Sequence, residues 1–222
     1  DLEMLGAHFD AAAGWDSTSL SITAPRDRIL PALEVLAELV TDARFPDSEV
    51  ERARSEQLGE IMQNHAEPRA LANERIVQFI YGEQSTYGRS GLGTIETVER
   101  LTPADVRAFH HDRYAPADAA LIVVGAIDDA LVEQATALFA NWRAQPGATA
   151  DHAPGSPPAS TRIHIVARPG SVQSEIRVGH SGLNRLDPDY FPIQVMNALL
   201  GGAFTSRLNM NLREKNGWTY GV

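Results

Sequence analysis

The chain has 222 residues, of which 43% are hydrophobic and 22% charged, and its formal net charge is −10 at pH 7. This composition is typical of a globular protein with a sizeable core and excludes an intrinsically disordered chain. The acidic balance argues against nucleic acid as a partner, the absence of cysteine excludes disulfides and cysteine-based zinc sites, and no apolar run approaches the roughly 20 residues of a membrane span.

The first predicted elements are a hairpin and three helices. Polar and apolar side chains alternate over residues 7–13 and 17–23, on either side of a turn at Gly14. Apolar residues then recur at helical spacing over 28–41, 47–64 and 68–82. The following segment is rich in glycine, serine and tyrosine and is predicted to be a loop.

A further helix, strand and helix complete the first predicted domain. Thr102 and the proline after it open a helix that extends to Arg113. Residues 119–124, AALIVV, are continuously apolar, which predicts a strand buried on both faces. Asp128 or its neighbour then caps a helix that extends to Trp142.

The next segment predicts a linker. Residues 144–160 contain four prolines and show no apolar period. Beyond it, strands over 162–167 and 172–178 and a helix over 187–200 repeat an α+β order. We therefore expect two related α+β domains, residues 1–143 and 161–222, joined by this Pro-rich linker. The chain opens on the end of a helix and closes inside an apparent strand, so we expect both domains to be truncated.

The stretch 199–220, LLGGAFTSRLNMNLREKNGWTY, carries the candidate site. A short helix from about Ser206 ends at Asn216-Gly217, residues that suit a left-handed cap. Arg213 lies late in this helix, and Tyr220 follows the turn on a predicted short strand. An arginine and a phenol placed on opposite sides of one turn can grip a peptide carbonyl or a carboxylate. Spacing alone favours a simpler interpretation, in which the arginine caps helix carbonyls and the tyrosine packs.

Over nearly its whole length the chain resembles the pitrilysin or insulinase family of zinc metallopeptidases, which includes the processing-peptidase type. The blocks that carry the resemblance are LGAHFDA, FPDSEVERARSEQLGEI, residues 87–128 and, most specifically, residues 168–222. The resemblance implies that pairs of related α+β domains form each half of a clamshell, which closes around a peptide. The two halves belong to one polypeptide or to separate subunits.

The resemblance also defines what a zinc site would need. In the family, two histidines of a His-x-x-Glu-His helix bind zinc and the glutamate activates water. None of the seven histidines in this chain has another four residues away, and the family motif lies upstream of the position that matches Asp1. A third family ligand matches Glu60, but a family acid seven residues earlier is replaced by Ala53. We therefore expect at most a vestigial or incomplete metal site at Glu60 and no zinc in this chain.

Arg213 and Tyr220 match the family's arginine and tyrosine that hold substrate from the half opposite the zinc. The resemblance therefore favours substrate binding over capping and packing for this pair. We expect a non-catalytic half that contributes peptide-binding surface and is inactive as a peptidase alone. Two alternatives stay open: a fragment of the active half whose zinc motif lies upstream, and a structural relative without peptidase activity, such as a respiratory-complex core-type subunit.

The partners that the resemblance implies are a peptide or unfolded polypeptide and a second peptidase half. An exposed sheet edge in an incomplete first domain would also favour homo-oligomers. The compartment stays open, although the family's periplasmic bacterial members and the absence of cysteine lean toward the bacterial periplasm.

Overall fold

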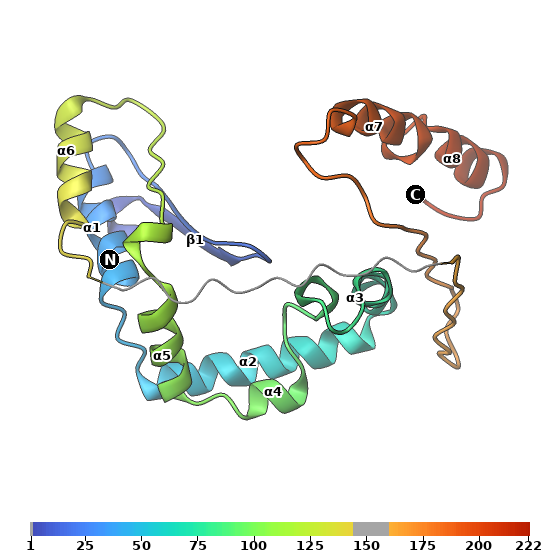
Figure 1. The fold of residues 1–222 in the computed structure, drawn as a ribbon, viewed down its shortest axis with the longest axis horizontal. Coiled ribbons are helices and arrows are strands. Elements are labelled where there is room, and N and C mark those ends of the chain that lie inside the picture. The colour runs from blue at the N-terminus through green and yellow to red at the C-terminus, as the bar shows by residue number, and fades with distance from the viewer. Residues whose placement is uncertain (1, 144–159) are drawn as a thin grey trace. The chain divides into compact units, whose positions relative to one another are not determined.

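The computed structural model describes residues 2–143 and 160–222, which belong to two compact units, Asp1–Gly179 and His180–Val222. Helices make up most of both units, and the sheet of the described residues has two strands (Figure 1). Apart from Ser160, the predicted linker lies outside the described residues. No helix in the two described ranges is long and apolar enough to span a membrane.

The described part of the first unit contains two strands, six α-helices and three short 3-10 helices. Their bounds are β1 (His8–Ala13), β2 (Thr18–Thr23), α1 (Ile29–Thr41), α2 (Asp47–Ala66), α3 (Pro68–Tyr81), α4 (Ile95–Glu99), α5 (Pro103–Arg113), α6 (Asp129–Leu138), η1 (Glu3–Leu5), η2 (Thr86–Gly88) and η3 (Pro116–Asp118). The predicted hairpin and the helices α1, α2, α3 and α5 are confirmed to within two residues. Helix α4 was not predicted, and α6 ends before the predicted Trp142.

The second unit is built from two helices that each widen into a π-helical turn. Helix α7 (Tyr190–Asn197) continues into η4 (Ala198–Gly202), and α8 (Arg207–Asn209) continues into η5 (Met210–Lys215). The predicted short helix from Ser206 is therefore confirmed, with Ser206 as its N-cap. The helix predicted over 187–200 begins later and ends as a π-helix.

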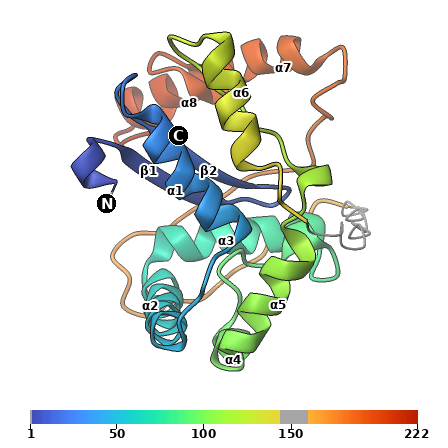
Figure 2. The same ribbon diagram turned by 90° about the vertical axis from the view of Figure 1, so that its left-hand side faces the viewer.

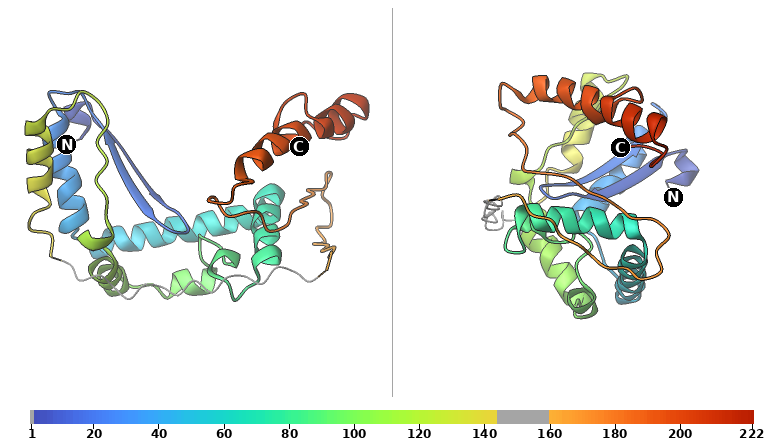
Figure 3. Two further views of the ribbon diagram at one scale, coloured as in Figure 1. Left: turned by 45° about the horizontal axis from the view of Figure 1, so that its top comes forward. Right: turned by 90° about the vertical axis from the view of Figure 1, so that its right-hand side faces the viewer.

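The main core of the first unit lies between the hairpin, α1 and α6. Antiparallel pairing sets Phe9 opposite Ile22, which brings apolar side chains to one face of the hairpin. Helix α1 covers this face (Figure 2), and α1 and α6 run side by side (Figure 3, left). The buried cluster consists of Leu33, Leu36, Leu131 and Ala135, with Phe9, Leu20, Ile22, Ile29 and Leu138 packed around it.

The N-terminal cap of α6 contributes stability that depends on pH. The Asp128 carboxylate accepts a hydrogen bond from the Leu131 backbone N–H (2.9 Å) and pairs with the Arg26 guanidinium (2.6 Å). The backbone hydrogen bond first, and the guanidinium after it, hold the pKa of Asp128 below its ordinary value. The pKa of Asp128 is therefore lower in the folded state than in the unfolded state. The stability that its contacts contribute is complete above the ordinary aspartate pKa, about 4, and is lost as the pH falls through the lowered value.

We therefore expect Asp128→Asn to lower the thermal midpoint of unfolding at pH 6, by an amount that shrinks as the pH falls below about 4. Thermal melts of both chains across this range measure the difference. Asp129→Asn is the matched control, because the contacts to Leu131 and Arg26 are made by the preceding carboxylate. A difference between the unchanged chain and Asp128→Asn that stays constant down to pH 2 would contradict this assignment.

Helix α2 is the platform on which α3, α4 and α5 pack. Its Ile61 is 2% exposed. Arg107 of α5 donates to the Phe45 carbonyl (2.7 Å) and pairs with the Asp47 carboxylate, which ties α5 to the start of α2. Thr102 and Asp105 form a reciprocal capping box at the start of α5, which confirms that this helix opens after Thr102.

Three predicted strands are wrong. Residues 119–124, 162–167 and 172–178 are described, and none of them forms a strand. Ile122 is 82% exposed and Val172 is 99% exposed, whereas residues 119–124 were expected to be buried on both faces. A strand needs hydrogen bonds from a neighbouring strand, and within the described ranges only β1 and β2 supply them to each other.

Residues 160–179 instead lie against α3 and the end of α2 without regular structure. The Arg177 guanidinium donates to the Asn73 side chain (2.7 Å), and the His164 ring stacks on Phe79 with 3.7 Å between ring centroids. Arg168 also donates to the Ala66 carbonyl. The segment therefore belongs to the first unit, although it follows the predicted linker.

Candidate functional site

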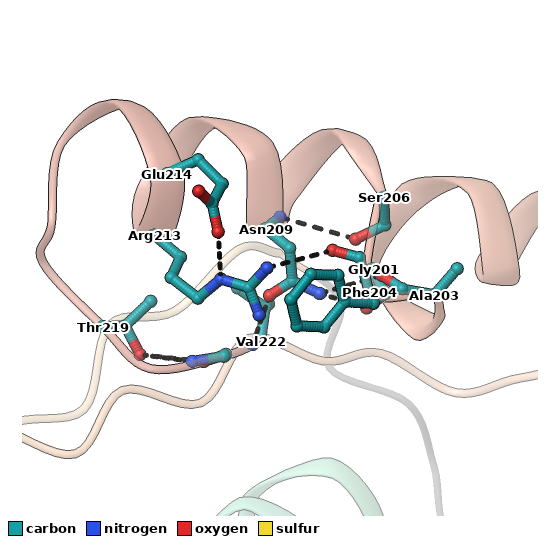
Figure 4. A network of polar contacts seen from close by, with 10 residues as sticks. Gly201, Ala203, Phe204, Ser206, Asn209, Arg213, Glu214, Thr219 and Val222 are labelled. Atoms are coloured by element: carbon teal, nitrogen blue, oxygen red, sulfur yellow. Dashed lines mark hydrogen bonds and ion pairs between the residues drawn. The ribbon is translucent and has the colours of Figure 1, made fainter.

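The candidate site is built on a bend between two helical stretches of the second unit (Figure 4). The π-helical turn η4 ends at Gly202, and the Ala203 N–H still donates to the Ala198 carbonyl (3.0 Å). The chain then turns through Phe204 to Ser206, whose hydroxyl accepts a hydrogen bond from the Asn209 N–H (3.4 Å) and caps α8. This bend places Phe204 beside the helix that carries Arg213.

Arg213 is held in place by its neighbours. Its guanidinium carbon lies 3.6 Å from the centroid of the Phe204 ring, and its Nε donates to the Glu214 carboxylate (2.8 Å). One Nη2 hydrogen points to the Phe204 carbonyl oxygen, at a long 3.5 Å. The side chain is 17% exposed. The remaining guanidinium N–H groups have no partner among the described residues and can donate to a ligand carbonyl or carboxylate.

Arg213 does not cap its own helix with its side chain. The helix end is satisfied by backbone groups: the Gly217 N–H donates to the Arg213 carbonyl, and the Trp218 N–H donates to the Leu212 carbonyl, both at 2.9 Å. Gly217 has φ +65°, the left-handed conformation expected at such a cap. The simpler interpretation from spacing is therefore wrong for the arginine.

Tyr220 lies beyond this turn and is 95% exposed. It is not packed into a core, and its segment does not form the predicted strand. Among the described residues no hydrogen bond or ring contact joins Tyr220 to Arg213. The structure brings the two onto one short unit, flanking the Gly217 turn, with the guanidinium anchored and the phenol exposed.

The described residues do not form a group that fits a zinc ion. Glu60 lies on the exposed side of α2, and Ala53 occupies the same helix two turns earlier. Within residues 2–143 and 160–222, no three His, Cys, Asp or Glu side chains are grouped so that they could hold a metal ion. A zinc site normally needs three protein ligands.

Sequence reasoning missed three residues of the site: Phe204, Ser206 and Asn209. Ser206 carried a signal, because serine ahead of a helical stretch is a typical N-cap. The stacking of Phe204 on Arg213 and the burial of Asn209 depend on how the bend folds back on the helix. The residue pattern alone does not indicate them.

Comparison with protein families gives matches over almost the whole chain. Residues 100–222 match the family model described as Peptidase M16 inactive domain. Residues 1–94 match the model described as Insulinase (Peptidase family M16). The first of these covers more than half of the chain and includes both Arg213 and Tyr220.

Sequence matches to individual proteins agree with the match to this family. The chain is 30% identical over 207 residues to an uncharacterized zinc protease of Streptomyces coelicolor, a match that covers 88% of this chain and 44% of that protein. It is 22% identical over 206 residues to the probable mitochondrial-processing peptidase subunit beta of Arabidopsis thaliana, covering 90% of this chain and 38% of that protein. The chain thus spans about half the length, or less, of these relatives.

Solved structures share the fold. The crystal structure of a peptidase M16 inactive domain from Pseudomonas fluorescens has a TM-score of 0.81 and 27% identity, covering 99% of this chain and 53% of that one. A protease from Helicobacter pylori has a TM-score of 0.80 at 19% identity, covering 97% of this chain and 53% of that one. The α+β fold that the resemblance implied is therefore confirmed.

Proposed function

Because the chain belongs to peptidase family M16, the insulinase family, we propose that it is a non-catalytic half that supplies peptide-binding surface. In this proposal Arg213 and Tyr220 hold an extended polypeptide, and the zinc that would cleave it belongs to another half. The observation that carries the proposal is the anchored guanidinium of Arg213, which keeps donor groups available on the same short unit as the exposed phenol of Tyr220.

The chemistry of the pair supports a peptide as ligand. An extended polypeptide presents backbone carbonyls, which accept hydrogen bonds from a guanidinium or a phenol. The Phe204 ring and the Glu214 carboxylate hold the guanidinium, so little of its side-chain entropy remains to be lost on binding.

The proposed domain organisation follows the family. We propose two related α+β domains, residues 1–143 and 161–222, joined by the Pro-rich segment 144–160, with both domains incomplete. The incompleteness is supported by the coverage of the relatives, since the chain spans 44% of the Streptomyces coelicolor protein and 53% of the Pseudomonas fluorescens chain. The proposed partner is a second peptidase half, in the same polypeptide or a separate subunit, with a second copy of the chain as the other arrangement.

A binding measurement tests the peptide-holding role without requiring catalysis. Fluorescein-labelled β-casein, a polypeptide without stable tertiary structure, is titrated with the chain and followed by fluorescence anisotropy. We expect saturable binding that Tyr220→Phe weakens by about 2- to 12-fold, the equivalent of one neutral hydrogen bond. Tyr114→Phe, on the first unit, is the matched control and should leave binding unchanged. Equal affinities for the unchanged chain and Tyr220→Phe would refute the role of the phenol.

A second candidate is a fragment of the zinc-bearing half. It is favoured by the Streptomyces coelicolor relative, which is named as a zinc protease and of which this chain covers 44%. The residues upstream of Asp1 in the full-length protein decide between the two. A His-x-x-Glu-His motif there would favour the catalytic half and would contradict the non-catalytic one.

A further inference from the structure

The largest buried polar side chain near the candidate site belongs to Asn209, at the end of α8. Asn209 is 6% exposed, and Ser206, one turn earlier, is 2% exposed. Asparagine has a low helix propensity, so its place in the continuous helical stretch from Arg207 to Lys215 is not explained by local preference. A buried amide must also find hydrogen-bond partners, because an unsatisfied one is costly.

The Asn209 amide uses both of its donors and its acceptor on three different backbone groups (Figure 4). Its Nδ2 donates to the Ala203 carbonyl (2.9 Å) and to the Gly201 carbonyl (3.3 Å). Its Oδ1 accepts the Val222 N–H at 3.0 Å. The two carbonyls on one side and the N–H on the other fix the orientation of the amide, since a flipped amide would oppose like groups.

These three partners lie on the segments that carry the candidate site. Ala203 adjoins Phe204, whose ring stacks on Arg213. Val222 lies two residues beyond Tyr220, after the Gly217 turn. A Cβ built on Gly201 would lie 4.0 Å from the Val222 Cγ1, which places the Val222 side chain near the start of the bend.

We propose that Asn209 is a positioning residue, which fixes the segment of Tyr220 and the bend of Phe204 to the helix of Arg213. The inference rests on the proposed peptide-holding role, which it deepens by stating how the two ligand-holding side chains keep their relative places. Asn209 itself touches no ligand in this proposal. Its contribution is to hold the backbone on both sides of the site.

Amide hydrogen exchange followed by NMR on the full chain tests the positioning directly. In Asn209→Ala the Val222 amide loses its acceptor and is expected to exchange about fivefold faster or more. The Met210 amide, which donates to the Ser206 carbonyl, should keep its protection. Asn209→Asp keeps an acceptor for the Val222 N–H but sets its second oxygen against the Gly201 and Ala203 carbonyls, so it should restore the protection of Val222 only in part. Asn211→Ala, two residues along the same helix, is the matched control and should leave Val222 unchanged.

Two results would overturn the inference. One is an unchanged Val222 exchange rate in Asn209→Ala. The other is uniformly faster exchange across residues 190–222, which would make Asn209 a general stabiliser of the unit. Because exchange needs no ligand, it decides the inference even if the β-casein titration refutes the peptide-holding role.

The β-casein titration adds the link to binding. If both the peptide-holding role and the positioning role hold, Asn209→Ala weakens binding, and it weakens binding less in the Tyr220→Ala chain than in the unchanged chain, since part of its effect acts through Tyr220. Full additivity of the two effects would show that Asn209 does not act through Tyr220 and would contradict the proposal.

Discussion

Replacing Leu33 by alanine is expected to lower the free energy of unfolding by about 2–5 kcal/mol. Leu33 is 5% exposed and belongs to the cluster that joins α1, α6 and the hairpin. Truncation removes buried methyl groups and leaves a cavity that the surrounding helices only partly close. Urea denaturation followed by far-UV circular dichroism measures the change.

Leu39→Ala is the matched control for this prediction. Leu39 lies on the same helix, and its side chain is 40% exposed, so the same truncation should cost about 1 kcal/mol or less. Equal losses at the two positions would contradict the assignment of the core. A large loss at Leu33 alone would support the assignment of the core between the hairpin, α1 and α6.

Replacing Arg213 by alanine is expected to weaken β-casein binding by about 10- to 100-fold, because hydrogen bonds from a charged donor are worth about 1.5–3 kcal/mol. The loss should exceed that of Tyr220→Phe, which removes one neutral hydroxyl. Fluorescence anisotropy again measures the affinity. Thermal melts of the same samples show whether the unit stays folded without the guanidinium.

Two further variants separate the geometry of Arg213 from its charge. Arg207→Ala removes a positive charge from the same helical stretch at an exposed position, and we expect it to leave the affinity nearly unchanged. Arg213→Lys keeps the charge but loses the planar fork that stacks on Phe204 and donates in two directions. We expect this lysine variant to bind almost as weakly as the alanine variant. Full binding by Arg213→Lys would mean that charge alone suffices.

Arg213 and Tyr220 are held in place by different residues. The side chain of Arg213 depends on Phe204, nine residues earlier, and on its neighbour Glu214. The backbone around Tyr220 depends on the Asn209 amide, eleven residues earlier. We therefore expect the proposed peptide-holding surface to be sensitive to changes at residues that do not touch the peptide.

The sequence alone determined the helices and the family. Helical periodicity, the start of a helix after Thr102 and the short helix from about Ser206 are local patterns within one or two turns, and the structure confirms them. The blocks that resemble the insulinase family lie in a linear order, so they too could be read without a fold, and they pointed to Arg213 and Tyr220 as candidates.

Only the tertiary structure decided which groups lie together. The apolar run at 119–124 has no strand beside it, and Arg213 stacks on Phe204 where spacing had favoured a capping role. The physical reason is that strand pairing, ring stacking and the hydrogen bonds of a buried amide all need partners from distant segments. A sequence pattern indicates which groups require a partner, and the tertiary structure determines which partner each group has.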